Sequence, residues 1–258
     1  MIKALYRFIV AIGLNPKVVR ASFKGWPYFR RDLREMRRQL KGNKEFAITI
    51  LRPVFRDRFE NNGVLGHYFY ENLSVAQRIF QNNPKRHVDV GSHVDGFVGH
   101  VASFREIEVF DIRPQTAKVR NIRFVVADFM NISPELHNYT DSISSLNVIE
   151  HFGLGRYGDP IDVNGHLKGL DNIYNVLKPG GKFYFSAPIG KQRIEFNSHR
   201  AFDLAYLLKI FEPIYHIDYF SYIDDKSNFY PNVSLDPEKV RTNYGCWFGF
   251  GIFEMTKK

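Results

Sequence analysis

One strand–turn–helix unit constrains the fold of this chain more than any other stretch of its sequence. Residues 87–99 read HVDVGSHVDGFVG. The apolar run predicts a short buried strand at 87–90, the glycines predict a tight turn, and the apolar residues that follow predict a helix. Such a turn leaves the first N–H groups of the helix free, and glycine lets the backbone approach a ligand closely. We therefore expect a ligand site at this turn.

The segments after the turn alternate between predicted strands and helices, which is typical of a parallel sheet with helices on both faces. The expected strands end at 90, at Asp111 and at 127, and then cover 141–149, 182–186, 216–223 and 246–256. No helix separates the last two, so they predict an antiparallel hairpin at one edge. Asp111 lies twenty positions after Gly91, where folds that bind dinucleotides place an acid for ribose hydroxyls. The turn after the first strand lacks the G-x-G-x-x-G pattern, which argues against a nicotinamide dehydrogenase.

The positive charge of the chain is concentrated in its first 44 residues. These carry twelve Lys/Arg and two acids, a net +10, whereas the whole chain is +9 and the other 214 residues are −1. Leu5, Phe8, Ile9 and Ile12 fall on one face of a predicted first helix, which is too short to span a bilayer. No A-x-A cleavage site follows it, so we expect no cleaved signal peptide. We interpret it as an interfacial amphipathic helix or as a helix docked on the domain.

A second predicted helix begins after Trp26-Pro27 and ends at Gly42-Asn43. Its apolar stripe is surrounded by arginines. It either binds an anionic membrane surface or polymer, or it is a solvated helix packed by its stripe. The single cysteine, Cys246, excludes an internal disulfide and fits a reducing compartment. We expect a cytoplasmic protein, with peripheral attachment to the inner face of the membrane as the alternative that residues 1–44 leave open.

A glycine-rich loop, GLGRYGDPIDVNG, covers residues 153–165. Connections of this length inside a compact domain are usually functional. Arg156 and Tyr157 offer a fork of donors and a flat face, which suit a sugar or a phosphate group. The alternative is that the loop packs on itself, with Asp159 and Asp162 capping turns or pairing with Arg156.

Five motifs in order resemble the class I S-adenosylmethionine-dependent methyltransferase superfamily. They are DVGSHVDG (89–96), the strand end at Asp111, AD (127–128), NVIEH (147–151) and VLKPGGKFYFSAP (176–188). The resemblance implies an α/β fold: a Rossmann-like, doubly wound, seven-stranded sheet, mostly parallel with an antiparallel final strand. It covers residues 66–258 and leaves residues 1–65 as a basic helical N-terminal arm. The stretches GLGRYGDPID and NSHR further resemble an uncharacterised methyltransferase-like family linked to bacterial surface-polysaccharide genes.

The resemblance also implies a cofactor, S-adenosyl-L-methionine, and the residues that bind it. Gly91 and Gly96 would face its methionine part, with Asp89 at the strand end beneath it, and Asp111 would hold the ribose hydroxyls. Asp128 would accept a hydrogen bond from the adenine amine, and Ile112 and Phe129 would cover the adenine ring. Asn147 and His151 would border the methyl group. His93 and Asp95 replace expected glycines and Gly96 falls one place late. We therefore expect a turn one residue longer than usual.

A hydroxyl acceptor needs a base, and histidine suits this role near neutral pH. His151 and His199 are the candidates, although His199 beside Asn197 and Ser198 also fits a helix start. A metal site of His151, Asp159 and His166 has no tight spacing, and we expect no metal. The residues expected to contact the substrate are Arg156, Tyr157, Asp159, Asn197 and Arg200.

The sequence thus predicts an enzyme that methylates a hydroxyl of a glycan or glycan precursor in surface-polysaccharide biosynthesis. The alternatives are an RNA methyltransferase and a non-catalytic cofactor-binding or scaffold protein. Against the nucleic-acid alternative, the basic residues are confined to the arm, and no N-P-P-[YF] motif occurs.

Overall fold

A computed structural model describes residues 2–60, 63 and 65–258 of the chain. The chain divides into two compact units, Met1–Val64 and Leu65–Lys258. Across the described residues, no helix is both long enough and apolar enough to cross a bilayer.

The first unit holds two helices, α1 (Ile2–Ala11) and α2 (Pro16–Gln39). The expectation that the second helix begins after Pro27 is wrong, because α2 runs through that proline. The Asn15 side chain accepts a hydrogen bond from the Lys17 N–H at 3.0 Å, and Pro16 occupies the first turn, where its missing N–H costs nothing. A capped start therefore lies well upstream of Pro27.

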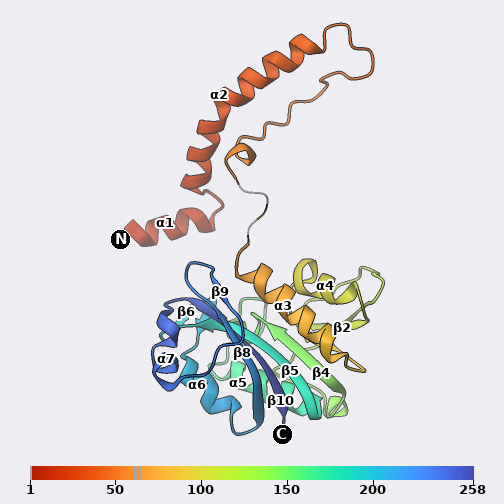
Figure 1. Cartoon of the computed structure of the whole chain (residues 1–258), viewed down its shortest axis with the longest axis vertical. Coiled ribbons are helices and arrows are strands. Elements are labelled where there is room, and N and C mark those ends of the chain that lie inside the picture. Colours follow the sequence, from red (N-terminus) through yellow and green to blue (C-terminus); the bar gives the residue numbers. More distant parts are fainter. Residues whose placement is uncertain (1, 61–62, 64) are drawn as a thin grey trace. The chain divides into compact units, whose positions relative to one another are not determined.

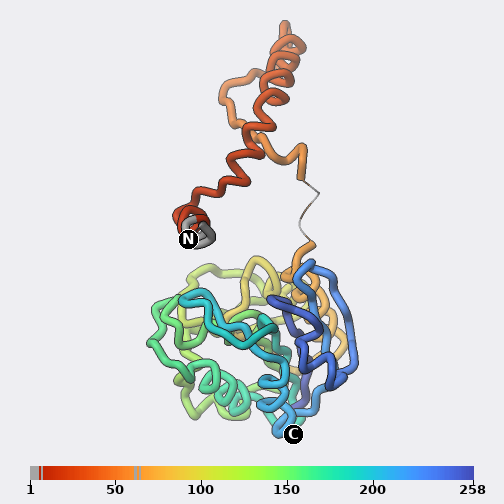
Figure 2. Tube along the Cα trace, turned by 90° about the vertical axis from the view of Figure 1, so that its left-hand side faces the viewer, coloured from red at the N-terminus to blue at the C-terminus, as the bar shows by residue number. Residues whose placement is uncertain are grey.

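The chain then returns alongside α2, as both views show (Figures 1 and 2). A Cβ on Gly25 would lie 1.9 Å from the Phe55 carbonyl oxygen, so only glycine allows this approach. The rings of Trp26 and Phe29 each lie 5.6 Å from that of Phe55. Residues 46–55 form no strand, and most of their side chains are exposed. A short 3-10 turn, Asp57–Phe59, follows.

The second unit is built on an eight-stranded sheet in the order β3-β2-β1-β4-β5-β10-β8-β9 (Figure 1). The strands are β1 (Val88–Val90), β2 (Ile107–Asp111), β3 (Ile122–Val126), β4 (Thr140–Leu146), β5 (Leu177–Ile189), β8 (Tyr215–Ile223), β9 (Phe229–Tyr230) and β10 (Gly249–Lys257). β1 to β5 are parallel, and β10 lies antiparallel between β5 and β8. The predicted Rossmann-like fold is confirmed, but the strand count was one short, since the polar insertion 224–245 adds β9.

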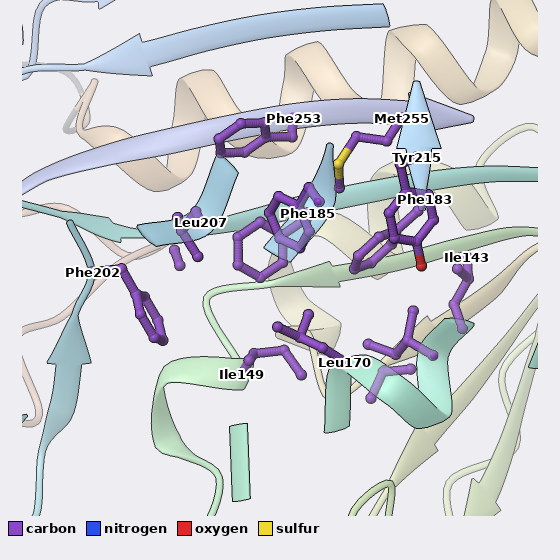
Figure 3. Close-up of a cluster of buried hydrophobic side chains, with 14 of the residues drawn as sticks. Ile143, Ile149, Leu170, Phe183, Phe185, Phe202, Leu207, Tyr215, Phe253 and Met255 are labelled. Atoms are coloured by element: carbon purple, nitrogen blue, oxygen red, sulfur yellow. The ribbon is translucent and has the colours of Figure 1, made fainter. Parts of the chain in front are cut away.

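Helices cover both faces of this sheet. They are α3 (His67–Asn82), α4 (Gly99–Ala102), α5 (Gly165–Val176), α6 (Leu204–Phe211) and α7 (Pro237–Arg241), and a separate hairpin pairs β6 (Arg193–Glu195) with β7 (His199–Ala201). Side chains alternate along each strand. Phe183 and Phe185 therefore join the core that includes α5 and α6 (Figure 3). Tyr184 between them joins the core with α3 and α4 on the other face of the sheet.

Candidate active site

A cavity of about 340 Å³ lies where β1, β2 and β4 end. This volume is in the range of small-molecule sites. Because parallel strands end at the same sheet edge, residues far apart in sequence meet here. Its lining includes Gly91, Asp111, Ile112, Arg113, Asp128, Phe129, Asn147, Glu150, His151, Arg156, Tyr157, Asp159 and His199, together with His67, Tyr68 and Phe250.

The turn after β1 brings bare backbone to the cavity wall. Gly91 has φ +70°, and a Cβ there would lie 2.7 Å from Cγ1 of Val148, so a side chain would be both strained and crowded. Asp89 is fully buried and does not line the cavity. Its carboxylate accepts hydrogen bonds from the Ser92 N–H (2.9 Å), the Ser92 hydroxyl (2.7 Å) and the Ser144 hydroxyl (2.6 Å). Asp89 therefore fixes the turn from beneath.

The rest of this turn is a π-helical turn, Val94–Val98, which takes in one residue more than an α-helical turn. Gly96 lies inside it and does not line the cavity. A Cβ on Gly96 would lie 2.7 Å from the Asn72 side-chain nitrogen on α3. The small size of Gly96 serves the contact with α3, and the cavity lining gives no support to the prediction that Gly96 faces the cofactor.

Asp111 reaches the cavity, but its carboxylate already has a partner. Arg113 donates from its backbone N–H (2.8 Å) and Nε (2.9 Å) to Oδ1, and from Nη2 (2.7 Å) to Oδ2. The same guanidinium lies 4.5 Å from the centre of the Tyr157 ring. Arg113 thus joins the predicted ribose-binding acid to the glycine-rich loop. No sequence motif pointed to it.

The next strand end supplies Asp128 and Phe129, as predicted. Asp128 Oδ1 accepts from the Met130 N–H at 2.8 Å. The buried Phe129 ring meets Phe110 edge to face at 5.7 Å, and Ile112 lines the wall beside them. This part of the cavity wall combines apolar side chains with one carboxylate.

A buried polar network sets the orientation of Asn147. Its Nδ2 donates to Glu71 Oε2 at 2.7 Å, and the Ser186 hydroxyl donates to Glu71 Oε1 at 2.7 Å. With its amide nitrogen fixed, Asn147 keeps Oδ1 buried and without a hydrogen-bond partner in the described chain. Burial raises the pKa of Glu71 to about 7. Sequence reasoning missed Glu71 because it lies 76 positions from Asn147 on a helix.

Glu150 is a second buried acid, and unlike Glu71 it lines the cavity. It is 2% exposed, and its Oε2 has no partner among the described residues. Burial raises the pKa of its carboxyl well above the usual value, and the neighbouring Glu71 raises it further. Sequence reasoning missed Glu150 because nothing in the motif NVIEH distinguishes a buried glutamate from an exposed one.

His151 is held in one orientation by the backbone. Its Nδ1 lies 2.6 Å from the Ser198 carbonyl oxygen, an acceptor only, so Nδ1 carries the proton and Nε2 is the free base. Nε2 lies 3.9 Å from Glu150 Oε1. Burial lowers the pKa of His151 to about 4, so the ring is neutral at pH 7. A neutral, oriented imidazole at a cavity wall can accept a proton.

His199 also lines the cavity, from strand β7. Its Nδ1 lies 2.8 Å from the Ser198 hydroxyl, and burial lowers its pKa. It does not start a helix: the N-cap of α6 is Asp203, whose side chain accepts from the Ala205 N–H at 3.0 Å.

The glycine-rich loop is closed by Asp159. Its carboxylate accepts from the N–H groups of Gly153 (2.9 Å), Gly155 (3.1 Å) and Tyr157 (3.1 Å). Asp159 therefore caps the loop, which is one of the two roles expected of it, and it also lines the cavity. Arg156 donates to the Ser198 carbonyl oxygen at 3.0 Å and lies 5.1 Å from the Tyr157 ring centre.

Two predicted substrate residues lie outside the cavity. Asn197 is exposed in the β6–β7 turn. Arg200 is 4% exposed and donates to backbone carbonyl oxygens, the nearest being that of Phe152 at 2.6 Å. Its role is to hold the loop. His166 bonds Tyr206 at 2.8 Å instead of joining His151, and the described residues include no cluster of three metal-ligand side chains.

The start of α3 forms one wall of the cavity. The His67 ring stacks on Phe250 with centres 3.9 Å apart, and Tyr68 lies next to it. Both side chains therefore line the cavity at the first turn of α3.

The fold is shared with several solved structures. The 1,6-didemethyltoxoflavin-N1-methyltransferase of Burkholderia thailandensis, solved with 1,6-didemethyltoxoflavin and S-adenosylhomocysteine, is 13% identical; the match covers 75% of this chain and 79% of that one with a TM-score of 0.51. The MccD protein is 14% identical over 73% and 96% with a TM-score of 0.50. The [4+2]-cyclase SpnF is 15% identical over 72% and 80% with a TM-score of 0.50. At these identities the likeness shows a common fold, which hosts more than one chemistry.

No curated protein sequence matches the chain. A family model does match residues 103–241, which include most of the cavity-lining strand ends and the whole glycine-rich loop. Because this match takes in more than half of the chain, the chain belongs to the DUF268 family, described as a Caenorhabditis protein of unknown function.

Proposed function

We propose that this chain is an S-adenosylmethionine-dependent methyltransferase. The observation that carries the proposal is the meeting of three features at one cavity. These are the side-chain-free turn at Gly91, the strand-end carboxylate of Asp111, and the side chain of Asn147, which Glu71 holds in place. A turn, an acid and a fixed amide in one wall suit a nucleoside that also bears an amino-acid part.

The cavity residues fit this cofactor. Gly91 leaves room for the methionine part, and the apolar side chains of Ile112 and Phe129 suit the adenine ring, with Asp128 beside them. Asp111 would hold the ribose hydroxyls by charge-assisted hydrogen bonds. When bound, the cofactor supplies a methyl group activated by a positively charged sulfur.

We further propose that the acceptor is a hydroxyl and that His151 Nε2 takes its proton. The neutral ring, with Nδ1–H directed at the Ser198 carbonyl oxygen, supports this role. His199 is the second candidate base at the same wall. Methyl transfer otherwise requires mainly that the acceptor be held in line and that water be excluded.

The proposed acceptor is a glycan or glycan precursor. The guanidinium groups of Arg113 and Arg156 both lie over the Tyr157 ring, and this cluster of donors at the cavity wall suits a sugar bearing hydroxyl or acidic groups. The resemblance of the loop and of NSHR to a family linked to bacterial surface-polysaccharide genes is the other support. A cytoplasmic location belongs to the same proposal.

Calorimetry with S-adenosylhomocysteine tests the cofactor. We expect the intact chain to bind it and Asp111→Ala to lose most of the affinity. If neither protein binds, the methyltransferase proposal is wrong. Binding without any transfer would favour the non-catalytic alternative, for which the Arg113 bond to Asp111 is the motivating observation.

Transfer of a labelled methyl group from the cofactor to separated bacterial fractions tests the acceptor. We expect label in the glycolipid fraction and a loss of label with His151→Gln. Label in RNA and not in glycan would overturn the acceptor class while leaving the reaction type intact.

A further inference from the structure

Helix α2 has one face covered by its own unit. Gly25 touches the Phe55 backbone, and Phe29 meets the Phe55 ring at 5.6 Å. Asp32, farther along, pairs with Arg58. The returning segment thus covers this face of α2, where Phe29 belongs to the apolar stripe that was expected to pack.

The opposite face of α2 carries a row of exposed side chains. Val19, Phe23, Arg30, Arg34 and Arg37 follow one another at steps of four, seven, four and three residues, which keep them on one side of a helix. Phe23 is 76% exposed and Val19 46%. The row is therefore apolar at its first part and cationic at its last.

The arginines of this row have no acidic partner in the described chain. Both acids of α2 are paired elsewhere: Asp32 with Arg31 and Arg58, and Glu35 with Arg38. An unpaired cationic stripe that continues an exposed apolar one calls for a partner that is apolar and anionic together.

The apolar end of the row continues into α1 and the turn after it. Phe8 is 63% exposed, and Ile12 and Leu14 are each 59% exposed. Leu14, Pro16, Val19, Arg20 and Phe23 line one shallow groove. Large apolar side chains exposed next to each other mark an interaction surface.

We propose that this row, Val19 to Arg37 with its extension to Phe8, docks on an anionic lipid surface. Apolar side chains would enter the headgroup boundary, and the arginines would bind lipid phosphates and acidic headgroups. Charge complementarity favours this occupant over a second copy of the chain, because two cationic rows repel each other. The inference does not depend on the methyltransferase proposal, and no cofactor enters its test.

The test sediments the whole chain with vesicles of phosphatidylcholine alone and of phosphatidylcholine mixed with phosphatidylglycerol. We expect binding to the mixed vesicles only, weakening as KCl is raised. The triple variant Arg30→Gln, Arg34→Gln and Arg37→Gln should partition about 100-fold more weakly, at about fivefold per basic residue. Phe23→Ser should weaken it about tenfold through lost apolar burial.

A matched control removes the same charge from the other unit. Lys178→Gln, Lys226→Gln and Lys239→Gln change three exposed lysines and should leave partitioning nearly unchanged. Equal losses in the two triple variants, or equal binding to neutral vesicles, would overturn the proposal. An absence of vesicle binding would also overturn it. Ultracentrifugation would then show whether the row binds a second copy of the chain, and a salt-dependent titration whether it binds RNA.

Discussion

Arg113 binds the Asp111 carboxylate that the cofactor ribose would need, so removing the Arg113 side chain should strengthen nucleoside binding. Three hydrogen bonds from Arg113 reach Asp111. Each carboxylate oxygen has about two acceptor positions, so a single position remains for two ribose hydroxyls. The Arg113 side chain must therefore move for both hydroxyls to bind. We predict that Arg113→Ala binds S-adenosylhomocysteine more tightly than the wild-type chain.

The magnitude follows from the exposure of the pair. The Arg113 and Asp111 side chains are 54% and 20% exposed, so solvent screens their attraction, and breaking such a pair costs up to about 1 kcal/mol. The contact with the Tyr157 ring adds about 0.5–1 kcal/mol. Removing a competing interaction of about 1–2 kcal/mol should raise the affinity about 5- to 30-fold.

Isothermal titration of both proteins measures this effect. The matched control is Arg123→Ala, which removes an exposed arginine of β3. Arg123 pairs with Glu108 of β2, away from the cavity. We expect no change in affinity there. Weaker binding by Arg113→Ala would refute the reasoning, since it would show that Arg113 helps hold the nucleoside instead of competing with it.

Three further predictions concern the turn and the buried polar groups. His151→Gln should lower kcat about 10²- to 10⁴-fold and leave the affinity for S-adenosylhomocysteine unchanged. The pKa of His151 is lowered to about 4. The rate of the wild-type chain, which depends on the neutral ring, should therefore fall only as the pH drops through that value. Burial raises the pKa of Glu71 from 4.5 to about 7. The stability that its bound proton contributes is therefore present below about pH 4.5 and lost as the pH rises through about 7. Glu71→Gln should increase the free energy of unfolding, measured with urea, by an amount that grows with pH across this window. Gly91→Ala should lower the melting temperature, at a cost of about 1–3 kcal/mol, because φ is +70° and the new Cβ would lie 2.7 Å from Val148.

Each of these has a control in the chain. His199→Gln separates the two candidate bases, and an equal kcat loss there would leave His151 without a special role. Glu135→Gln changes an exposed glutamate, and parallel pH curves for it and Glu71→Gln would contradict the burial argument. Gly180→Ala has φ +74° with open space around it, so an equal cost at Gly91 would show that only backbone strain matters.

The positions of the strands along the chain and the edge where a site forms follow from local features of the sequence. Periodicity and turn residues are local and parallel strands end together, so the sequence placed Gly91 and Asp111 at one edge, and the resemblance added Asp128 and Asn147. The structure brings all four to one cavity. A local signal misled at Pro27, because a capped helix start upstream outweighs the proline.

The orientation of the polar side chains at the site follows from the tertiary structure alone. Asn147 is held because Glu71, on α3, accepts from its amide nitrogen, and His151 keeps Nε2 unprotonated because the Ser198 carbonyl accepts from Nδ1. These partners lie 76 and 47 positions away. Contacts across such separations leave no spacing pattern in a single sequence, because they depend on how helices and loops pack over the sheet edge.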